Sequence, residues 1–204
     1  MARVAILISG RGSNARALLE RAEETEYPAT IVGILSDRPD AAGLASGAVH
    51  DVPVAVVERL LAERKVEHEE RVNAVLREWH AEIVCLAGYM RVLSADFVRE
   101  WNGRLLNIHP SLLPAFPGLD THERALKRGV TIHGCTVHLV TEGVDEGPIL
   151  AQAAVPVLPD DTPKTLASRV LAEEHKLYAD ALADWIEERT RLDADGRIVR
   201  TDRA

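Results

Sequence analysis

The chain has 204 residues, of which 47% are hydrophobic, and its formal net charge at pH 7 is −8. This length suits one domain with a core of ordinary size. The scattered acidic excess argues against nucleic acid as a partner. No apolar run reaches the roughly 18 residues that a membrane span needs, and the N-terminus has no signal-peptide layout. Cys85 and Cys135 are the only cysteines, and both lie in apolar segments, which indicates buried free thiols in a reducing compartment.

The first half of the chain alternates between apolar runs and amphipathic segments. The apolar runs, which are typical of buried parallel strands, cover residues 3–9, 30–36, 53–57, 82–88 and 104–109. The helices predicted between them cover residues 13–25, 41–48, 67–79 and 94–101. Ser13 or Asn14 is placed to cap the first of these helices, and Ser94 the last. This alternation predicts a parallel sheet flanked by helices.

The second half of the chain has a different pattern. Two apolar segments at 131–140 and 148–157 are separated by a short Gly-containing turn, which favours an antiparallel pair. A long helix is expected at about 163–189, capped by Thr162. An Asp-Gly pair in the tail favours a small hairpin at about 190–200.

These patterns together predict the α/β class. We expect one domain over residues 1–204, built on a mostly parallel, Rossmann-like sheet with helices on both faces and an antiparallel pair in the second half.

A Gly-rich loop at residues 9–14 joins the first strand to the first helix. Its backbone N–H groups and the helix N-terminus suit an anion, although a tight turn without a ligand has the same pattern. Ser13 and Asn14 favour a terminal phosphate, because their side chains add donors that a passing pyrophosphate needs less.

A dinucleotide is the alternative ligand for this loop. Gly10, Gly12 and Ala15 match the pattern G-x-G-x-x-A, and Asp37 follows the second strand, where a ribose-binding acid is expected. The second interpretation therefore predicts a nicotinamide-dependent oxidoreductase.

Asn107 and His109 lie two residues apart in a predicted strand that ends at Pro110. Residues i and i+2 share a face of a strand, so the amide and the imidazole point the same way. Ligands of open α/β sheets bind at this carboxyl edge, and two such donors could stabilise an oxyanion. The alternative is a structural histidine that is hydrogen-bonded to the backbone.

Asp145 lies in an acidic segment, residues 141–148, between the two later strands. It is either part of a solvated turn or a carboxylate opposite His109, where it would favour the protonated ring. His133 and His138 are five residues apart in one strand and therefore face opposite sides, which disfavours a shared metal. His122 could cap a helix or line the site.

Four segments of the chain resemble glycinamide ribonucleotide formyltransferase, the folate-dependent enzyme family of purine biosynthesis. They are SGRGSN (9–14), LAGYMR (86–91), NIHPSLLP (107–114) and DEGP (145–148). The resemblance extends from residue 3 to about residue 190. The NIHPSLLP segment is shared with methionyl-tRNA formyltransferase and formyltetrahydrofolate hydrolase, whereas SGRGSN and the short chain favour the ribonucleotide enzyme.

The resemblance implies roles for individual residues. It implies that the catalytic residues are Asn107, His109 and Asp145. It implies that the substrate phosphate is bound by Gly12, Ser13 and Asn14, and that Glu174 contacts the substrate ribose or amine. The implied folate-binding residues, which act together with the 139–145 loop, are Lys65, Met90, Arg91, Val92, Leu93 and Asn107. Lys65 stands where the family usually has arginine, which keeps the charge but loses the planar fork. A cis Leu113–Pro114 bond is also implied.

The resemblance also implies the ligands and the setting. The substrates would be glycinamide ribonucleotide and 10-formyltetrahydrofolate, the latter a cosubstrate, with no retained cofactor and no metal. We expect a cytoplasmic enzyme, a possible homodimer, and neither nucleic-acid nor membrane partners. Another formyl-folate enzyme, a dinucleotide oxidoreductase and a catalytically silent binding protein are the alternatives, and an assay of folate release with candidate amines separates them.

Overall fold

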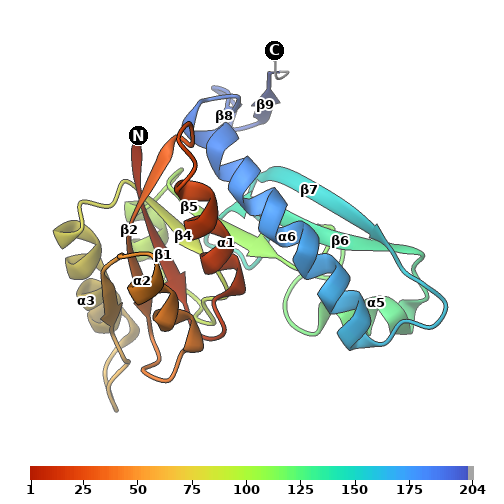
Figure 1. The fold of residues 1–204 in the computed structure, drawn as a ribbon, viewed down its shortest axis with the longest axis horizontal. Helices are drawn as coiled ribbons and strands as arrows, with labels where there is room; N and C mark the ends of the chain where they lie inside the picture. The colour runs from red at the N-terminus through yellow and green to blue at the C-terminus, as the bar shows by residue number, and fades with distance from the viewer. Residues whose placement is uncertain (202–204) are drawn as a thin grey trace. The chain divides into compact units, whose positions relative to one another are not determined.

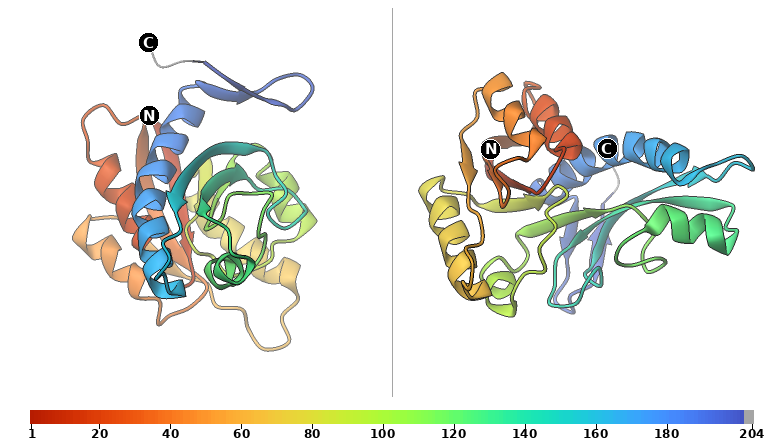
Figure 2. Two further views of the ribbon diagram at one scale, coloured as in Figure 1. Left: turned by 90° about the vertical axis from the view of Figure 1, so that its right-hand side faces the viewer. Right: turned by 90° about the horizontal axis from the view of Figure 1, so that it is seen from below.

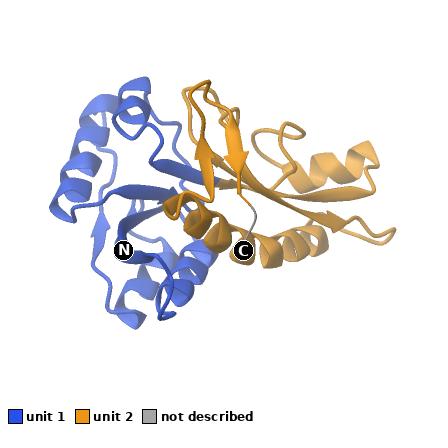
Figure 3. Cartoon of the chain, turned by 90° about the horizontal axis from the view of Figure 1, so that it is seen from above, with its two compact units in different colours: residues 1–107 blue, residues 108–204 orange. Residues whose placement is uncertain are grey.

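The computed structural model describes residues 1–201, whose helices and strands are labelled in Figure 1. The chain divides into two compact units, residues 1–107 and 108–204, which have different colours in Figure 3. The sheet order is β3-β2-β1-β4-β5-β6-β7, and a second sheet pairs β8 with β9. This is the mostly parallel α/β architecture with an added antiparallel pair that the sequence predicts.

Unit 1 is a βαβ arrangement in which each strand pairs in parallel with its neighbours. Its strands are β1 (Ala2–Ile8), β2 (Ala29–Ser36), β3 (Val54–Val56), β4 (Ile83–Leu86) and β5 (Leu105–His109), the last of which crosses into unit 2. Its helices are α1 (Ser13–Ala22), the 3-10 turn η1 (Ala42–Leu44), α2 (Ala45–Val49), α3 (Lys65–Glu78) and α4 (Ala95–Glu100).

The strand order of unit 1 reverses direction between β1 and β4. Right-handed crossovers then place α1 and α2 on one face of the strands, and α3 and α4 on the other. Figure 2 shows α1 and α2 on one side of these strands and α4 on the opposite side. The carboxyl ends of β1 and β4 therefore form a topological switch point, where ligands of such sheets bind.

The central strands of unit 1 are apolar because helices cover both of their faces. Ile6, Ile34 and Cys85 are completely buried. Gly33 lies within β2 because the ring of Trp79 packs against it, and a Cβ atom at this position would overlap that ring. The long hydrophobic runs of the sequence thus indicate strands that are buried on both faces.

Unit 2 is built on an antiparallel pair covered by one long helix. Its elements are α5 (Thr121–Arg128), β6 (Ile132–Leu139), β7 (Ile149–Pro156), α6 (Pro163–Ile186), β8 (Thr190–Leu192) and β9 (Ile198–Arg200). Helix α6 packs on both β6 and β7. Its first turn is capped by Thr162, whose hydroxyl accepts a hydrogen bond from the amide of Thr165. The antiparallel pair, the Thr162 cap and the terminal hairpin are all confirmed.

Three details differ from the sequence predictions. The residue that caps α1 is Gly12, in the left-handed conformation, and neither Ser13 nor Asn14 caps it. Helices α1 and α6 each end three residues before the predicted end. Helix α5 was not predicted, because its buried residues are only Thr121 and Ala125, which give too weak an apolar period. Within residues 1–201, no helix has both the length and the hydropathy that crossing a membrane requires.

Candidate active site

His109 ends β5 and is 6% exposed. Its Nε2 donates to the carbonyl oxygen of Phe116 at 3.0 Å, and its Nδ1 lies 3.3 Å from Oδ2 of Asp145. Both ring nitrogens therefore face acceptors, an arrangement that only the doubly protonated ring satisfies fully. The sequence prediction that Asp145 lies beside His109 is confirmed.

Asp145 lies in the turn between β6 and β7, in the left-handed region with a φ of 57°. Its Oδ2 accepts a hydrogen bond of 2.8 Å from the amide of Gly118. Its Oδ1 lies 3.7 Å from Nε2 of His138, whose Nδ1 is 2.8 Å from the carbonyl oxygen of Leu139. The carboxylate is therefore held between two imidazoles and a backbone amide.

His138 is a site residue that the sequence reasoning missed. Strand alternation disfavoured a metal shared with His133, and no other role of His138 was predicted. The overlooked signal was its position two residues before the turn that carries Asp145.

In this cluster, burial and the neighbouring charges shift the pKa values of Asp145 and His109 in opposite directions. Burial favours a raised pKa for Asp145, but the hydrogen bonds from His138 and Gly118 and the charge of His109 outweigh it, so the pKa lies below its ordinary value. For His109, burial is the largest effect and lowers the pKa, although the Phe116 carbonyl and Asp145 raise it. The contribution of Asp145 thus has the expected sign, while the net shift of His109 is downward.

The loop after β5 is fixed by its own hydrogen bonds. The Thr136 hydroxyl accepts from the Leu113 amide at 3.0 Å and donates to the Ser111 carbonyl oxygen at 2.7 Å. The Leu113–Pro114 bond is cis, as the resemblance implied. This segment is followed by the Phe116 carbonyl and the Gly118 amide, so the two backbone groups that contact the His109–Asp145 pair belong to an ordered loop.

Asn107 lies two residues before His109 on β5 and is half-buried. The alternation of a strand gives the two side chains the same direction, as predicted. His122 is the second residue of α5, and its ring meets the buried ring of His133 edge-on, with 5.3 Å between centroids. His122 is therefore part of an aromatic contact in unit 2 and does not cap a helix. Glu174 is a buried residue of α6.

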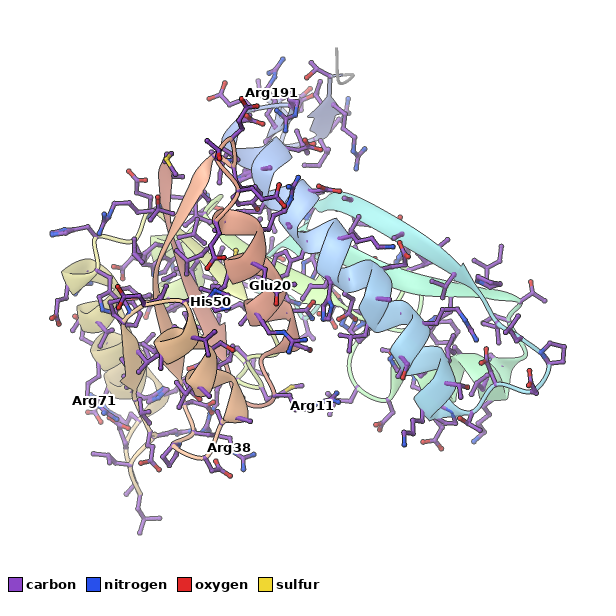
Figure 4. All side chains as sticks on the ribbon, in the orientation of Figure 1. Arg11, Glu20, Arg38, His50, Arg71 and Arg191 are labelled. Atoms are coloured by element: carbon purple, nitrogen blue, oxygen red, sulfur yellow. The ribbon has the colours of Figure 1, made fainter. Side chains whose placement is uncertain are left out.

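The Gly-rich loop of unit 1 is constrained at Gly12, which has a φ of 69°. A Cβ atom there would lie 2.5 Å from the Cα of Gly43, whose amide donates to the carbonyl oxygen of Gly10 at 3.0 Å. The following residues, Ser13 and Asn14, begin α1. Arg11 extends outward from this loop in Figure 4. The loop therefore leads directly into the N-terminus of α1, where backbone N–H groups suit an anion.

Asp37 decides between the two ligands proposed for this loop. It is 5% exposed, and each carboxylate oxygen has a partner. The Ser9 hydroxyl donates to Oδ1 at 2.5 Å, and Nε of Arg91 donates to Oδ2 at 2.5 Å. A ribose-binding acid must offer its oxygens to two hydroxyl groups, so this arrangement argues against the dinucleotide interpretation.

The residues predicted to bind folate lie in two segments of unit 1. Met90 and Val92 are 72% and 67% exposed in the irregular segment between β4 and α4. The Arg91 side chain pairs with Asp37, and Leu93 is half-buried. Lys65 is the first residue of α3, directly after Arg64, whose side chain pairs with Glu67.

Comparisons with known proteins agree on one family. The family model described as formyl transferase matches residues 2–182. The trifunctional purine biosynthetic protein adenosine-3 of Bos taurus is 47% identical over 197 residues, which are 97% of this chain. The chain spans only 20% of that protein's length.

Two further relatives match along nearly all of their length. The phosphoribosylglycinamide formyltransferase of Haemophilus influenzae is 36% identical over 192 residues, which cover 94% of this chain and 91% of that protein. The crystal structure of glycinamide ribonucleotide transformylase 1 from Symbiobacterium toebii has a TM-score of 0.95 at 42% identity, covering 99% of this chain and 95% of that one. The chain therefore belongs to the formyl transferase family, in the group of the phosphoribosylglycinamide formyltransferases.

Proposed function

We propose that this protein transfers a formyl group from 10-formyltetrahydrofolate to the amine of glycinamide ribonucleotide. The observation that carries the proposal is the buried His109–Asp145 pair at the end of β5, two residues after Asn107. Asn107 and His109 can both donate hydrogen bonds to an oxyanion, and the carboxylate of Asp145 can accept and release a proton.

The reaction joins the substrate amine to the formyl carbon and breaks the bond from that carbon to N10 of the folate. The amine loses one proton and N10 gains one, so a group that moves a proton is needed. The amine resembles an α-amino group with a pKa of about 8, so a useful fraction is neutral at cellular pH. The harder requirement is the negative charge that develops on the formyl oxygen.

Asn107 and protonated His109 meet that charge with two hydrogen-bond donors. Burial lowers the pKa of His109 and so disfavours the charged ring in the free protein. An oxyanion at the site favours the protonated ring in the same way as Asp145 does. Asp145 orients His109 and passes the amine proton toward the departing nitrogen, directly or through water.

The substrates take the binding residues that the resemblance implied. The ribose phosphate binds at Gly12, Ser13 and Asn14, and Glu174 meets the ribose or the amine. Folate binds at Lys65, at the segment from Met90 to Leu93 and at Asn107. Residues 1–204 act as one formyltransferase domain. The enzyme is cytoplasmic, in keeping with its buried free thiols.

One assay tests the proposal. Purified protein is mixed with 10-formyltetrahydrofolate and glycinamide ribonucleotide, and tetrahydrofolate and the formylated amine are quantified by mass spectrometry. Equal yields of the two products are expected. Formate release without amine would instead indicate a hydrolase, and equal rates with plain glycinamide would contradict recognition of the phosphate. An NADH fluorescence change that saturates would revive the dinucleotide interpretation.

A further inference from the structure

A buried polar cluster lies at the carboxyl ends of β1, β2 and β4 in unit 1. Asp37 is its centre, and its side chain is 4% exposed. The Ser9 hydroxyl gives its proton to Asp37, so its oxygen is free to accept, and it accepts from the Met90 amide at 2.8 Å. Asp37 thus holds the segment after β4 twice, through the backbone at Met90 and through the Arg91 guanidinium.

The opposite end of that segment is held by a second buried acid. Glu69 of α3 is 5% exposed, and its Oε1 accepts from the Ser94 amide at 2.8 Å. The Ser94 hydroxyl caps α4 by accepting from Phe97. Tyr89 directly precedes Met90, and its pKa is raised, by its burial first and then by the negative charge of Asp37, with a smaller effect of Glu69. Both acids therefore act on the same short segment.

The middle of the segment has no regular structure of its own. Among residues 1–201, the backbone groups of Arg91, Val92 and Leu93 have no hydrogen-bond partner, while Met90 and Val92 expose most of their side chains. Exposed peptide groups without a ladder partner can take many conformations unless their ends are fixed. The conformation of residues 90–93 therefore depends on the contacts at Ser9, Asp37 and Glu69.

We propose that Asp37 is a positioning residue that fixes residues 89–94 in the conformation that receives formyl folate, without contacting the folate itself. The inference rests on the proposed function, because it takes this segment as the folate site. Arginine stays protonated at all working pH values, so the Asp37–Arg91 pair is a permanent anchor. Apparent affinity falls in proportion to the fraction of molecules with a competent site.

The test compares two carboxylates three residues apart in the full chain. Asp37→Asn keeps an oxygen for Ser9 but removes the charge that pairs with Arg91. Asp40→Asn is the matched control, because Asp40 makes an equivalent pair with Arg38 at 3.1 and 2.9 Å but is 68% exposed. Steady-state kinetics give KM for each substrate, and anaerobic calorimetry with tetrahydrofolate gives its Kd.

Asp37→Asn is expected to raise KM for the formyl folate and Kd for tetrahydrofolate about tenfold, as for a competent fraction reduced to a tenth. KM for the ribonucleotide and kcat stay near wild type, and Asp40→Asn changes none of these values. In an Arg91→Met background, Asp37→Asn causes no further rise in the folate KM or Kd, because the Asp37–Arg91 pair is already broken.

Two results would overturn the inference while leaving the proposed function standing. One is an Asp37→Asn variant with the same folate constants as Asp40→Asn. The other is an equal rise in KM for both substrates, which would mark a general loosening of the unit. Absence of formyl transfer by the wild-type protein would instead reject the proposed function. If Asp37→Asn does not fold, Ser9→Ala removes the other link between Asp37 and the segment, the one through the Met90 amide, and must raise the folate constants selectively.

Discussion

Asp37 in unit 1 and Asp145 in unit 2 both have buried side chains, and the partners of the two carboxylates differ. Asp37 in unit 1 is held by an arginine and a hydroxyl, while Asp145 in unit 2 lies between the imidazoles of His109 and His138. Both side chains are at most 10% exposed, so burial does not distinguish them. The difference lies in whether the partner can lose its proton.

An arginine partner keeps its proton at any physiological pH, so the Asp37 pair supplies geometry and no proton. An imidazole partner titrates near neutrality, so the Asp145 cluster can hold a proton at one ring and release it. A buried acid paired with histidine is therefore the better candidate for chemistry. The following predictions test that contrast, from the largest expected effect to the smallest.

His109→Ala should lower kcat on the order of 100- to 1000-fold, because one donor to the oxyanion is lost. KM should change little, since that bond forms mainly in the transition state. Single-turnover formyl transfer is the measurement, with circular dichroism to verify folding. His50→Ala is the control, because His50 pairs with Glu23 in unit 1. Near-wild-type transfer by His109→Ala would return His109 to a structural role.

Asp145→Asn should change the pH dependence of kcat/KM as well as its size. The reaction needs protonated His109, whose pKa is lowered by burial, and a neutral amine with a pKa of about 8. The profile is therefore flat between these two values and falls on either side. Loss of the Asp145 charge lowers the His109 pKa further, so the acid limb moves to lower pH.

The plateau value of kcat/KM should also be lower in Asp145→Asn. It should fall about tenfold for each unit by which the His109 pKa decreases, because fewer molecules have a protonated His109. Asp37→Asn serves as the comparison, since its carboxylate has no imidazole partner, and its acid limb should stay in place. A limb that moves equally in both variants would contradict the distinction between the two carboxylates.

Stability in acid should reflect the histidines of unit 2. Burial lowers the pKa of His109 and His122, and burial followed by the charge of His122 lowers that of His133 to about 4. A lowered folded pKa means that the unfolded chain binds the proton first, so stability is lost as the pH falls below about 6.5. For His133 alone, the loss between pH 7.5 and 5 is roughly 2 kcal/mol.

Urea unfolding at the two pH values measures this loss. His133→Gln removes the titrating group and should reduce the difference between the two free energies of unfolding by that amount. An unaltered pH dependence in His133→Gln would show that the ring is not the source.

Local sequence patterns were enough to predict most elements of the fold. Apolar runs identified the buried strands, and the Thr162 and Ser94 caps were both correct. The shared direction of Asn107 and His109 on their strand also followed from the sequence, because strand alternation depends only on spacing. Helix α5 was missed because its one buried face has almost no large apolar residues.

The sequence by itself determined the alternation of strands and helices, the Gly-rich loop and the shared direction of Asn107 and His109, since each depends on neighbours within a few residues. Only the tertiary structure decided what each buried acid contacts. Asp37 meets Arg91 across 54 positions of the chain, and Asp145 meets His109 through a turn between two later strands. Such contacts depend on strand order and loop path, which local periodicity does not encode. The same residue type therefore became an anchor in one unit and a candidate for proton transfer in the other.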